Sequence, residues 1–248
     1  MDLQEFFREN RKVALAFSGG VDSAYLMYAA KSFGAEVKAY YVKSAFQPEF
    51  EYRDACQAAG FCGVEMETIT IDILDCPEVT ANPKDRCYYC KQKIFGAILK
   101  QAKRDGFEVL MDGTNASDEV SDRPGMKVLA QLQVRSPLRE CGLTKQRIRE
   151  LSREAGLFTW DKPAYACLAT RIPAGEQITK DKLERTEQAE NYLFSLGFTD
   201  FRVRMDQGRA KLQVPEAQLE KVLEKRPEIL RKLKKYYAEV FLDLEDRG

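Results

Sequence analysis

Apolar and polar positions follow two kinds of pattern along the first two thirds of the chain. Short, largely apolar runs, such as residues 13–17 (VALAF) and 37–43 (VKAYYVK), are typical of buried strands. Longer segments repeat apolar residues at helical spacing, and the one over residues 24–34 ends at a glycine. The same patterns predict further strands at residues 64–72 and 108–115 and further helices at residues 51–60 and 91–106.

Strands that alternate with helices indicate a parallel sheet covered by helices, because parallel neighbours need a helical crossover between them. We therefore predict a doubly wound α/β domain over residues 1–172. The pattern changes near Pro173, and residues 173–248 are predicted to form a small α+β domain. Its predicted elements are a helix (181–197), two strands around a short turn (201–206 and 210–214), and a helical stretch interrupted at Pro227 that leads to a last strand (216–244).

Composition narrows the class of protein. The 248 residues are 44% hydrophobic and 31% charged, which is typical of a water-soluble globular protein. The 39 basic and 39 acidic side chains cancel, which argues against a surface built for nucleic acid. No stretch approaches the roughly 18 apolar residues of a membrane span, and the first residues, MDLQEFFREN, do not resemble a signal peptide. With seven cysteines, an odd number, a reducing cytoplasmic location is expected.

The chain contains no histidine. This excludes a Ser-His triad, a Cys-His pair and an HExxH zinc site as the source of any activity. Catalysis is left to Asp, Glu, Lys, Arg and Cys side chains, to backbone amides, or to a bound cofactor.

Residues 18–23 (SGGVDS) join the first predicted strand to the first long helix. Glycines let the backbone approach an anion, and the amides at the helix N-terminus point toward it. Ser18 and Ser23 add hydroxyl donors, and Asp22 can hold a Mg²⁺ ion that bridges phosphate oxygens. The loop matches neither the Walker A nor the GxGxxG pattern. It is predicted to bind phosphate, the alternative being an ordinary turn with a serine cap.

Cysteines form a second candidate site. In RCYYCK, Cys87 and Cys90 lie one helical turn apart or in a tight turn, so that both thiols can face one point. Cys167 lies in a predicted loop near the domain boundary, whereas Cys56, Cys62, Cys76 and Cys141 are interpreted as small apolar residues. From the residues alone three interpretations remain open: a redox pair, a zinc site with Cys141 as the fourth ligand, or an iron–sulfur cluster with one iron lacking a protein ligand.

SGGVDS resembles the signature of the PP-loop ATP pyrophosphatases, which have an adenine nucleotide alpha hydrolase-like fold. The resemblance implies that ATP binds with its β,γ-pyrophosphate in the loop and is cleaved between the α and β phosphates. It also implies that residues 41–44 lie near the adenine and that residues 113–115 close over the α-phosphate. The nucleotide-binding residues expected on this basis are Ala16, Phe17, Ser18, Gly19, Gly20, Asp22, Ser23, Val42, Ser44, Gly113, Thr114 and Asp118.

Five further segments resemble the LarE family, the ATP-dependent pyridinium-3,5-biscarboxylate mononucleotide sulfur transferases. They are RCYYCK, DGTNASD, RPG (residues 123–125), SPLRECGLTKQRIRELSREAGL and, most specifically, WDKPAYACLATRIPAG. The similarity runs from about Val13 to Gln213. It implies that a substrate carboxylate is adenylated and its oxygen replaced by sulfur, in the biosynthesis of the nickel-pincer nucleotide cofactor of lactate racemase.

The resemblance also implies roles for single residues. Some members use one cysteine of the ACLATR-type motif, here Cys167, as a sacrificial sulfur donor. Others carry an additional CxxC, here Cys87 and Cys90, and are thought to use a [4Fe–4S] cluster. This chain is similar to the second group, so these three cysteines are the expected catalytic and metal-binding residues, together with Asp22 for catalysis. Substrate contacts are expected from Glu119, Arg171, Arg202 and Arg204.

One departure from the family bears on these expectations. Glu190 matches a carboxylate that binds a metal in the sacrificial members, but Gln213 stands where a glutamate is expected. The favoured function is therefore the cluster-using sulfur transferase, with ATP, Mg²⁺ and a [4Fe–4S] cluster, a small nucleotide substrate and, by resemblance, a homo-oligomeric state. The alternatives are a tRNA thiolase with a three-cysteine cluster and an ammonia-using synthetase of the NAD or GMP synthetase type. A nucleotide-binding protein without enzymatic activity is a further alternative.

Overall fold

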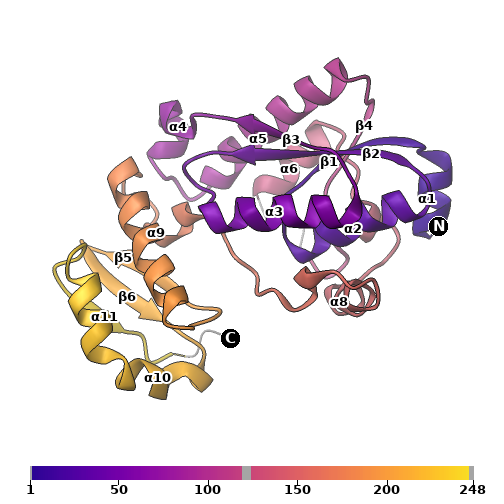
Figure 1. The fold of residues 1–248 in the computed structure, drawn as a ribbon. Coiled ribbons are helices and arrows are strands. Elements are labelled where there is room, and N and C mark those ends of the chain that lie inside the picture. Colours follow the sequence, from indigo (N-terminus) through magenta and orange to yellow (C-terminus); the bar gives the residue numbers. More distant parts are fainter. Residues whose placement is uncertain (1, 119–123, 246–248) are drawn as a thin grey trace. The chain divides into compact units, whose positions relative to one another are not determined.

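A computed structural model describes residues 2–118 and 124–245 of the chain. They fall into two compact units, which are described separately below (Figure 1). The first comprises the residues up to Asp72 together with Asp85–Lys162, and the second comprises Ile73–Lys84 together with the residues from Pro163 onward. Among the described helices, none combines the length and the apolar character that crossing a membrane would require.

The first unit is built on a four-stranded parallel sheet. Its strands lie in the order β3-β2-β1-β4, and β1 occupies an inner position between β2 and β4. In register, Leu15 of β1 lies opposite Ala39 of β2 and Met111 of β4. The prediction of a parallel α/β fold is confirmed. The strands are β1 (Lys12–Ala16), β2 (Glu36–Lys43), β3 (Met66–Thr70) and β4 (Val109–Met111).

Both faces of this sheet are covered. Val13 and Leu15 of β1 belong to one buried cluster, whereas Ala14 belongs to the other, as the two-residue period of a strand requires. The first cluster includes residues of α1, α2 and α3, and the second includes residues of α5 and α6. The helices are α1 (Leu3–Glu9), α2 (Val21–Ser32), α3 (Glu49–Cys62), α5 (Arg86–Arg104), α6 (Pro124–Gln131), α7 (Pro137–Glu140) and α8 (Lys145–Glu154), with the 3₁₀ turn η2 (Phe158–Asp161).

Two helix boundaries differ from the sequence-based prediction. Helix α3 passes through Gly60 and ends at Gly63, which adopts the left-handed conformation (φ 59°) that closes a helix at low cost for glycine. Helix α5 begins at Arg86 rather than at residue 91, so the cysteine segment lies in its first turns. The apolar stripe that predicted this helix begins only at Ile94, after the segment, in which Cys87 is exposed and Cys90 is half-buried.

The second unit has a three-stranded sheet in the order β5-β6-β7. Strands β5 and β6 form an antiparallel hairpin, and β7 is parallel to β6. The hairpin turn places Gln207 (φ 49°) and Gly208 (φ 79°) in the left-handed region, as in a type I′ turn. The elements are α9 (Lys180–Ser195), β5 (Arg202–Asp206), β6 (Arg209–Gln213), α10 (Leu219–Glu224), α11 (Arg226–Leu233) and β7 (Val240–Leu242), with η3 (Leu168–Arg171) and η4 (Glu216–Gln218).

A short excursion of the chain also belongs to the second unit. It contains η1 (Ile73–Asp75) and α4 (Pro77–Thr80), and it is held by Asn82. The Asn82 amide donates to the carbonyls of Pro173 (2.7 Å) and Glu176 (3.2 Å), and its own carbonyl accepts from Gly175 N. The predicted boundary after residue 172 therefore differs from the observed one after Lys162, because residues 163–178 pack with this excursion.

Candidate functional site

The loop between β1 and α2 has a backbone that only glycine fits at its first bend. Gly19 has a φ of 75°, and a Cβ at this position would lie 3.0 Å from the Cβ and 3.2 Å from the Cα of Ala55 in α3. Gly20 is the N-cap residue of α2 and offers no side chain to the amides of the first turn. These amides have no acceptor within the helix, which makes the turn suited to an anion.

Ser18 and Ser23 close the loop from its two ends. Their hydroxyl oxygens lie 3.0 Å apart, and Ser23 Oγ donates to the carbonyl of Gly20 (3.1 Å). Gly20 N in turn donates to Ser18 Oγ across 3.4 Å. Both hydroxyls are thus held at the helix N-terminus, as expected for a phosphate-binding loop.

A second turn, which follows β4, packs directly on this loop. A Cβ at Gly113 would lie 2.9 Å from the amide nitrogen of Ser23, so only glycine permits the approach of the two backbones. The buried carboxylate of Asp112 holds the turn by accepting from Thr114 Oγ1 (2.5 Å) and from Ser136 Oγ (2.7 Å). The structure therefore brings Gly113 and Thr114 to the loop, although they are about 90 residues away in sequence.

Asp22 lies where these two turns meet. Its carboxylate accepts from Lys145 Nζ (2.5 Å) and from Asn115 Nδ2 (3.4 Å). Burial raises the pKa of the Asp22 carboxyl above its ordinary value, whereas the hydrogen bond and the charge of Lys145 act to lower it. Asp118, whose charge also acts on Asp22, accepts a hydrogen bond from Asn115 N (2.9 Å). Carboxylates at the edge of a phosphate loop are the hard oxygen ligands that suit Mg²⁺.

The carboxyl end of β2 supplies the last group of predicted nucleotide-binding residues. Phe17 N donates to the carbonyl of Tyr40 (3.0 Å), which brings the start of the loop to this strand. Val42 is buried against the α5 face of the sheet, and the Ser44 hydroxyl donates to Gln47 Oε1 (2.7 Å). The residues predicted to surround a nucleotide thus come from neighbouring strand ends of one sheet, where ligands of open α/β folds bind.

Two cations of α8 belong to this region and are absent from the sequence-based prediction. Lys145, in the first turn, bonds Asp22, and Arg149, one turn later, donates to the carbonyls of Trp160 (2.5 Å) and Lys162 (2.9 Å). The spacing of four residues places both side chains on one face of the helix. Both residues lie in SPLRECGLTKQRIRELSREAGL, a segment that resembles the family but from which no site residue was predicted. Their spacing after the capping residue Thr144 is a weak signal by itself, because many solvent-exposed helices carry it.

The cysteines occupy both units. Cys87 and Cys90 lie at the start of α5 in the first unit, and Arg86 Nη2 lies 3.9 Å from Cys87 Sγ. Cys167 precedes η3 in the second unit. Within either unit, as far as the chain is described, no three cysteine or acidic side chains form a group able to hold a metal ion. Thiolates are soft ligands of the kind that iron–sulfur clusters use, so the type of donor fits such a cluster.

In the second unit, Arg171 holds the backbone around Cys167. Its guanidinium donates to the carbonyl of Ala166 (2.9 Å) and to Thr170 Oγ1 (2.7 Å), and Thr170 Oγ1 donates to the carbonyl of Cys167 (2.8 Å). Glu190 of α9 accepts from Arg171 Nε (2.8 Å). Arg171, expected to bind a substrate, is 1% exposed, and the hydrogen bonds described here join it to protein groups.

Glu190 is the centre of this buried network. Besides Arg171, its oxygens accept from the Tyr165 hydroxyl and from Val203 N (2.9 Å). Two guanidinium groups lie near the Tyr165 ring, that of Arg171 at 4.6 Å and that of Arg202 at 5.0 Å from the ring centre. In the described structure, both carboxylate oxygens of Glu190 are engaged by protein donors.

Arg202 and Arg204 share one face of β5, as their alternation predicts. Arg202 is buried and donates to the carbonyls of Ala164 and of Phe201. Arg204 donates to Gln213 Oε1 (2.6 Å), and Gln213 Nε2 donates to Asp243 (2.7 Å). Gln213, which departs from the family pattern, thus links Arg204 to Asp243. Its side-chain amide suits this position because it accepts a hydrogen bond through Oε1 and donates one through Nε2.

Glu119 and the cysteines interpreted as structural complete the set of residues singled out in the sequence. Glu119 lies outside the described residues. Cys56, interpreted from the sequence as a small apolar core residue, is exposed, whereas Cys62 and Cys141 pack against the core of the first unit as expected. The error for Cys56 has a simple cause, since the C-terminal half of α3 buries its alanines and turns this thiol outward.

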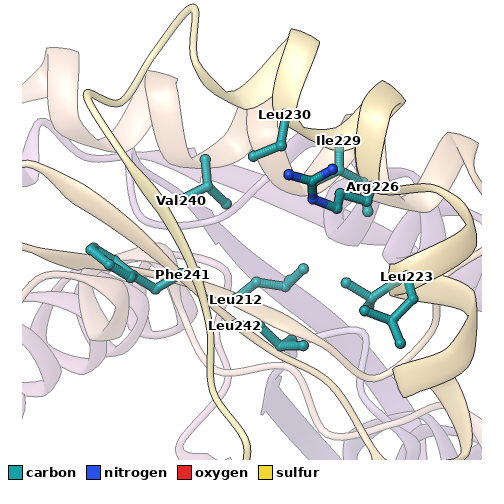
Figure 2. A pocket seen from close by; sticks show the side chains of 9 residues that line it. Leu212, Leu223, Arg226, Ile229, Leu230, Val240, Phe241 and Leu242 are labelled. Atoms are coloured by element: carbon teal, nitrogen blue, oxygen red, sulfur yellow. The ribbon is translucent and has the colours of Figure 1, made fainter.

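A cavity of about 220 Å³ lies in the second unit, and none of its lining residues is a predicted site residue (Figure 2). Its walls are apolar side chains of β6, β7, α10 and α11, with Arg226 at the edge. It offers no carboxylate, thiol or phosphate-binding loop, so it is not a candidate for the chemistry discussed here.

Comparison with known proteins identifies relatives over most of the chain, whereas no protein-family model matches it. An uncharacterized protein of Synechocystis is 36% identical over 90% of this chain and 84% of its own length. The pyridinium-3,5-bisthiocarboxylic acid mononucleotide synthase of Lactiplantibacillus plantarum is 32% identical over 86% of this chain and 78% of its own length. The tRNA-specific 2-thiouridylase MnmA of Thermotoga petrophila is 29% identical over 61% of this chain and 54% of its own length.

Proposed function

Because this chain belongs to the PP-loop ATP pyrophosphatases, in the family of the Lactiplantibacillus plantarum pyridinium-3,5-bisthiocarboxylic acid mononucleotide synthase, we propose that it is an ATP-dependent sulfur transferase. Its proposed substrate is pyridinium-3,5-biscarboxylic acid mononucleotide, and the proposed pathway is the biosynthesis of the nickel-pincer nucleotide cofactor of lactate racemase. The observation that carries the proposal is the phosphate loop with Asp22, in a chain whose named relatives are a bisthiocarboxylic acid synthase and thiouridylases.

In the proposed first step, a substrate carboxylate attacks the α-phosphorus of ATP. A bond forms between the carboxylate oxygen and the α-phosphorus, the bond to the bridging oxygen breaks, and the electron pair leaves with pyrophosphate. The loop amides and the hydroxyls of Ser18 and Ser23 are assigned to the pyrophosphate. The turn at Gly113 and Thr114 is assigned to the α-phosphate, and Val42 and Ser44 to the adenine side.

Mg²⁺ would be held by Asp22, with Asp118 nearby, and would neutralise phosphate charge when bound. In the second step a sulfide equivalent adds to the activated carbonyl carbon. The bond from that carbon to the adenylate oxygen then breaks, and AMP and a thiocarboxylate are the products. No net oxidation or reduction is needed, since sulfur enters and leaves this step at the sulfide level.

Cys87, Cys90 and Cys167 are the proposed cluster ligands. A [4Fe–4S] cluster with one iron lacking a protein ligand would, when bound, supply the sulfide. Arg202 and Arg204 are proposed to bind the substrate phosphate and carboxylate, for which guanidinium groups are well suited. For Arg171 the buried contacts favour a positioning role, in which it holds the Cys167 segment, over a direct contact with substrate.

The test starts with protein purified without oxygen. We expect a brown protein with iron and acid-labile sulfide, which releases pyrophosphate from ATP only with the pyridinium substrate. Mass spectrometry should detect the thiocarboxylate product. A colourless, iron-free protein whose C87A/C90A/C167A variant still transfers sulfur would disprove the cluster assignment.

The tRNA thiolases are the second candidate class, which the similarity to the Thermotoga petrophila enzyme supports over 61% of this chain. Since that similarity covers only 54% of the thiouridylase, the whole activity of the relative is not expected here. Loss of a thionucleoside from bulk tRNA in a deletion strain would favour this class over the pyridinium substrate. Light scattering of the purified protein will test the expectation of a homo-oligomer.

A further inference from the structure

The apolar cavity of the second unit has buried walls and an exposed rim. It has a volume of about 220 Å³ and lies between β6, β7, α10 and α11. Leu212, Val222 and Ile229 line it and are buried. Leu223 and Phe241 line it as well, and they are 65% and 43% exposed, respectively. Cavities with apolar walls hold water poorly, and one of about 150 Å³ binds benzene. This cavity can therefore accept an apolar group of roughly six to eight carbons.

Arg226 brings a positive charge to this cavity. Among the described residues that line the cavity, it is the only charged one, and Figure 2 shows its guanidinium directed into the space that the other labelled side chains enclose. The next positions on the same face of α11, Ile229 and Leu230, are apolar, so the helix offers no acidic partner to it. Within residues 2–118 and 124–245, no hydrogen bond or ion pair engages the guanidinium.

Two acidic side chains of the adjoining segments are already paired with other cations. Glu228 of α11 lies 3.1 Å from Lys225 Nζ, and Asp243, which follows β7, lies 2.8 Å from Lys211 Nζ. The guanidinium of Arg226 is therefore a cation at the edge of an apolar cavity, and its charge is complementary to that of an anion with an apolar tail. A carboxylate suits it best, because the two groups can form two parallel hydrogen bonds.

The extent of the apolar surface fits a small molecule better than a protein. Ordinary ligand pockets enclose about 300–1,000 Å³, and a stable protein interface buries about 800 Å² on each partner. The apolar surface around this cavity is limited by charged positions. Other than Leu223 and Pro227, the exposed residues of α10 and α11 are all charged: Glu220, Glu224, Arg226 and Arg231.

We propose that this cavity is a binding site for a small aliphatic monocarboxylate, with a chain of roughly eight carbons. The chain lies between the β6–β7 side of the sheet and helices α10 and α11, and the carboxylate pairs with Arg226. Binding is non-covalent. The site is separate from the proposed sulfur transfer, since none of the lining residues is among those assigned to the nucleotide, the cluster or the substrate.

Titration calorimetry of the full-length protein with sodium octanoate tests the site. We expect saturable binding at a single site. Hexanoate should bind about tenfold more weakly, because it buries two fewer methylene groups. Octylamine has the same chain with the opposite charge and should bind at least about tenfold more weakly than octanoate. Saturating ATP and Mg²⁺ should change the octanoate affinity by less than about twofold, because the nucleotide site lies on other residues.

Two variants and a matched control locate the binding. Arg226→Met should weaken octanoate binding by about tenfold, because the charge-assisted hydrogen bonds are lost. Leu223→Glu should weaken it to a similar degree, since the new carboxylate lies three residues before Arg226 and competes for the guanidinium. Both positions are exposed, so thermal unfolding should be nearly unchanged. The control is Arg231→Met, which removes the same charge from an exposed position of α11 outside the cavity and should bind as the unaltered protein does.

Several results would overturn the assignment. They are the absence of saturable octanoate binding, equal affinities for octanoate and octylamine, full affinity in Arg226→Met, and competition by ATP. A short peptide with a C-terminal leucine offers the same chemistry from a protein source. If that peptide binds more tightly than octanoate and loses affinity in Arg226→Met, the cavity serves a protein partner and the small-molecule assignment is wrong.

Discussion

Arg171 Nε donates a 2.8 Å hydrogen bond to Glu190 Oε1 between two side chains that are both almost fully buried. The pair joins the segment that carries Cys167 to helix α9, inside the second unit. Because the guanidinium also donates to the carbonyl of Ala166, the ion pair determines the shape of the cysteine loop. The same two residues therefore connect the stability of this unit to the presentation of the thiol.

Replacing Glu190 by glutamine should destabilise the second unit strongly. The change leaves a buried guanidinium without a counter-charge, which costs about 3–5 kcal/mol when a buried pair is broken. Urea denaturation followed by circular dichroism measures the loss. The control is Glu184→Gln, which removes a 56% exposed carboxylate of the same helix and should cost less than about 1 kcal/mol. Similar losses in the two variants would show that the buried network contributes little.

Gly113→Ala should damage the nucleotide site more than it damages the fold. Its Cβ would lie 2.9 Å from Ser23 N, so the turn after β4 and the phosphate loop must move apart. We expect ATP affinity to fall by more than tenfold. The matched control is Gly96→Ala, in the middle of α5, where the Cβ meets nothing within 4 Å and the helix gains about 1 kcal/mol. Calorimetric titration measures the ATP affinity of both variants, and thermal unfolding measures their stability. Normal ATP binding by Gly113→Ala would contradict the prediction.

Thiol modification should distinguish an exposed cysteine from a half-buried one whose pKa is raised. Burial raises the pKa of Cys62 to about 11, so at pH 8 only roughly one thousandth of this thiol is ionised. Iodoacetamide should therefore label the exposed Cys56 well before Cys62, and the Cys62 rate should rise about tenfold per pH unit up to pH 10. Peptide mass spectrometry after timed quenching gives both rates. Equal labelling at pH 8 would be incompatible with a packed Cys62.

The ion pair of Arg135 and Glu140 should make stability depend on pH. The hydrogen bond from Arg135 holds the pKa of the Glu140 carboxyl below its ordinary value. A lowered native pKa stabilises the fold above the unfolded pKa of about 4.3, and this contribution disappears as the pH falls through the native pKa. Glu140→Gln should therefore unfold at a lower temperature than the unaltered protein at pH 7, and the difference should shrink below about pH 4. A difference that is the same at pH 7 and pH 3 would contradict this.

Much of the first unit could be predicted from local patterns. The apolar runs at residues 13–17 and 37–43, separated by a segment of helical period, are enough to indicate parallel strands with a helix between them, and the structure has them as β1 and β2. The phosphate loop (residues 18–23) could also be predicted, since its glycines and serines affect the conformation and the hydrogen bonds of backbone only a few residues away. The start of α5 could not, because Cys87 and Cys90 lie outside its buried stripe.

The amino-acid sequence alone determined the fold class and the loop that suits a phosphate, because hydrophobic period, glycine conformation and helix capping act over a few neighbouring residues. It did not determine which charges meet. The pairing of Asp22 with Lys145, of Arg171 with Glu190, and of Asn82 with the carbonyl of Pro173 joins residues 19 to 123 positions apart. Such contacts depend on how the helices pack and on which distant segments the fold brings together. No pattern over a few neighbouring residues specifies these partners.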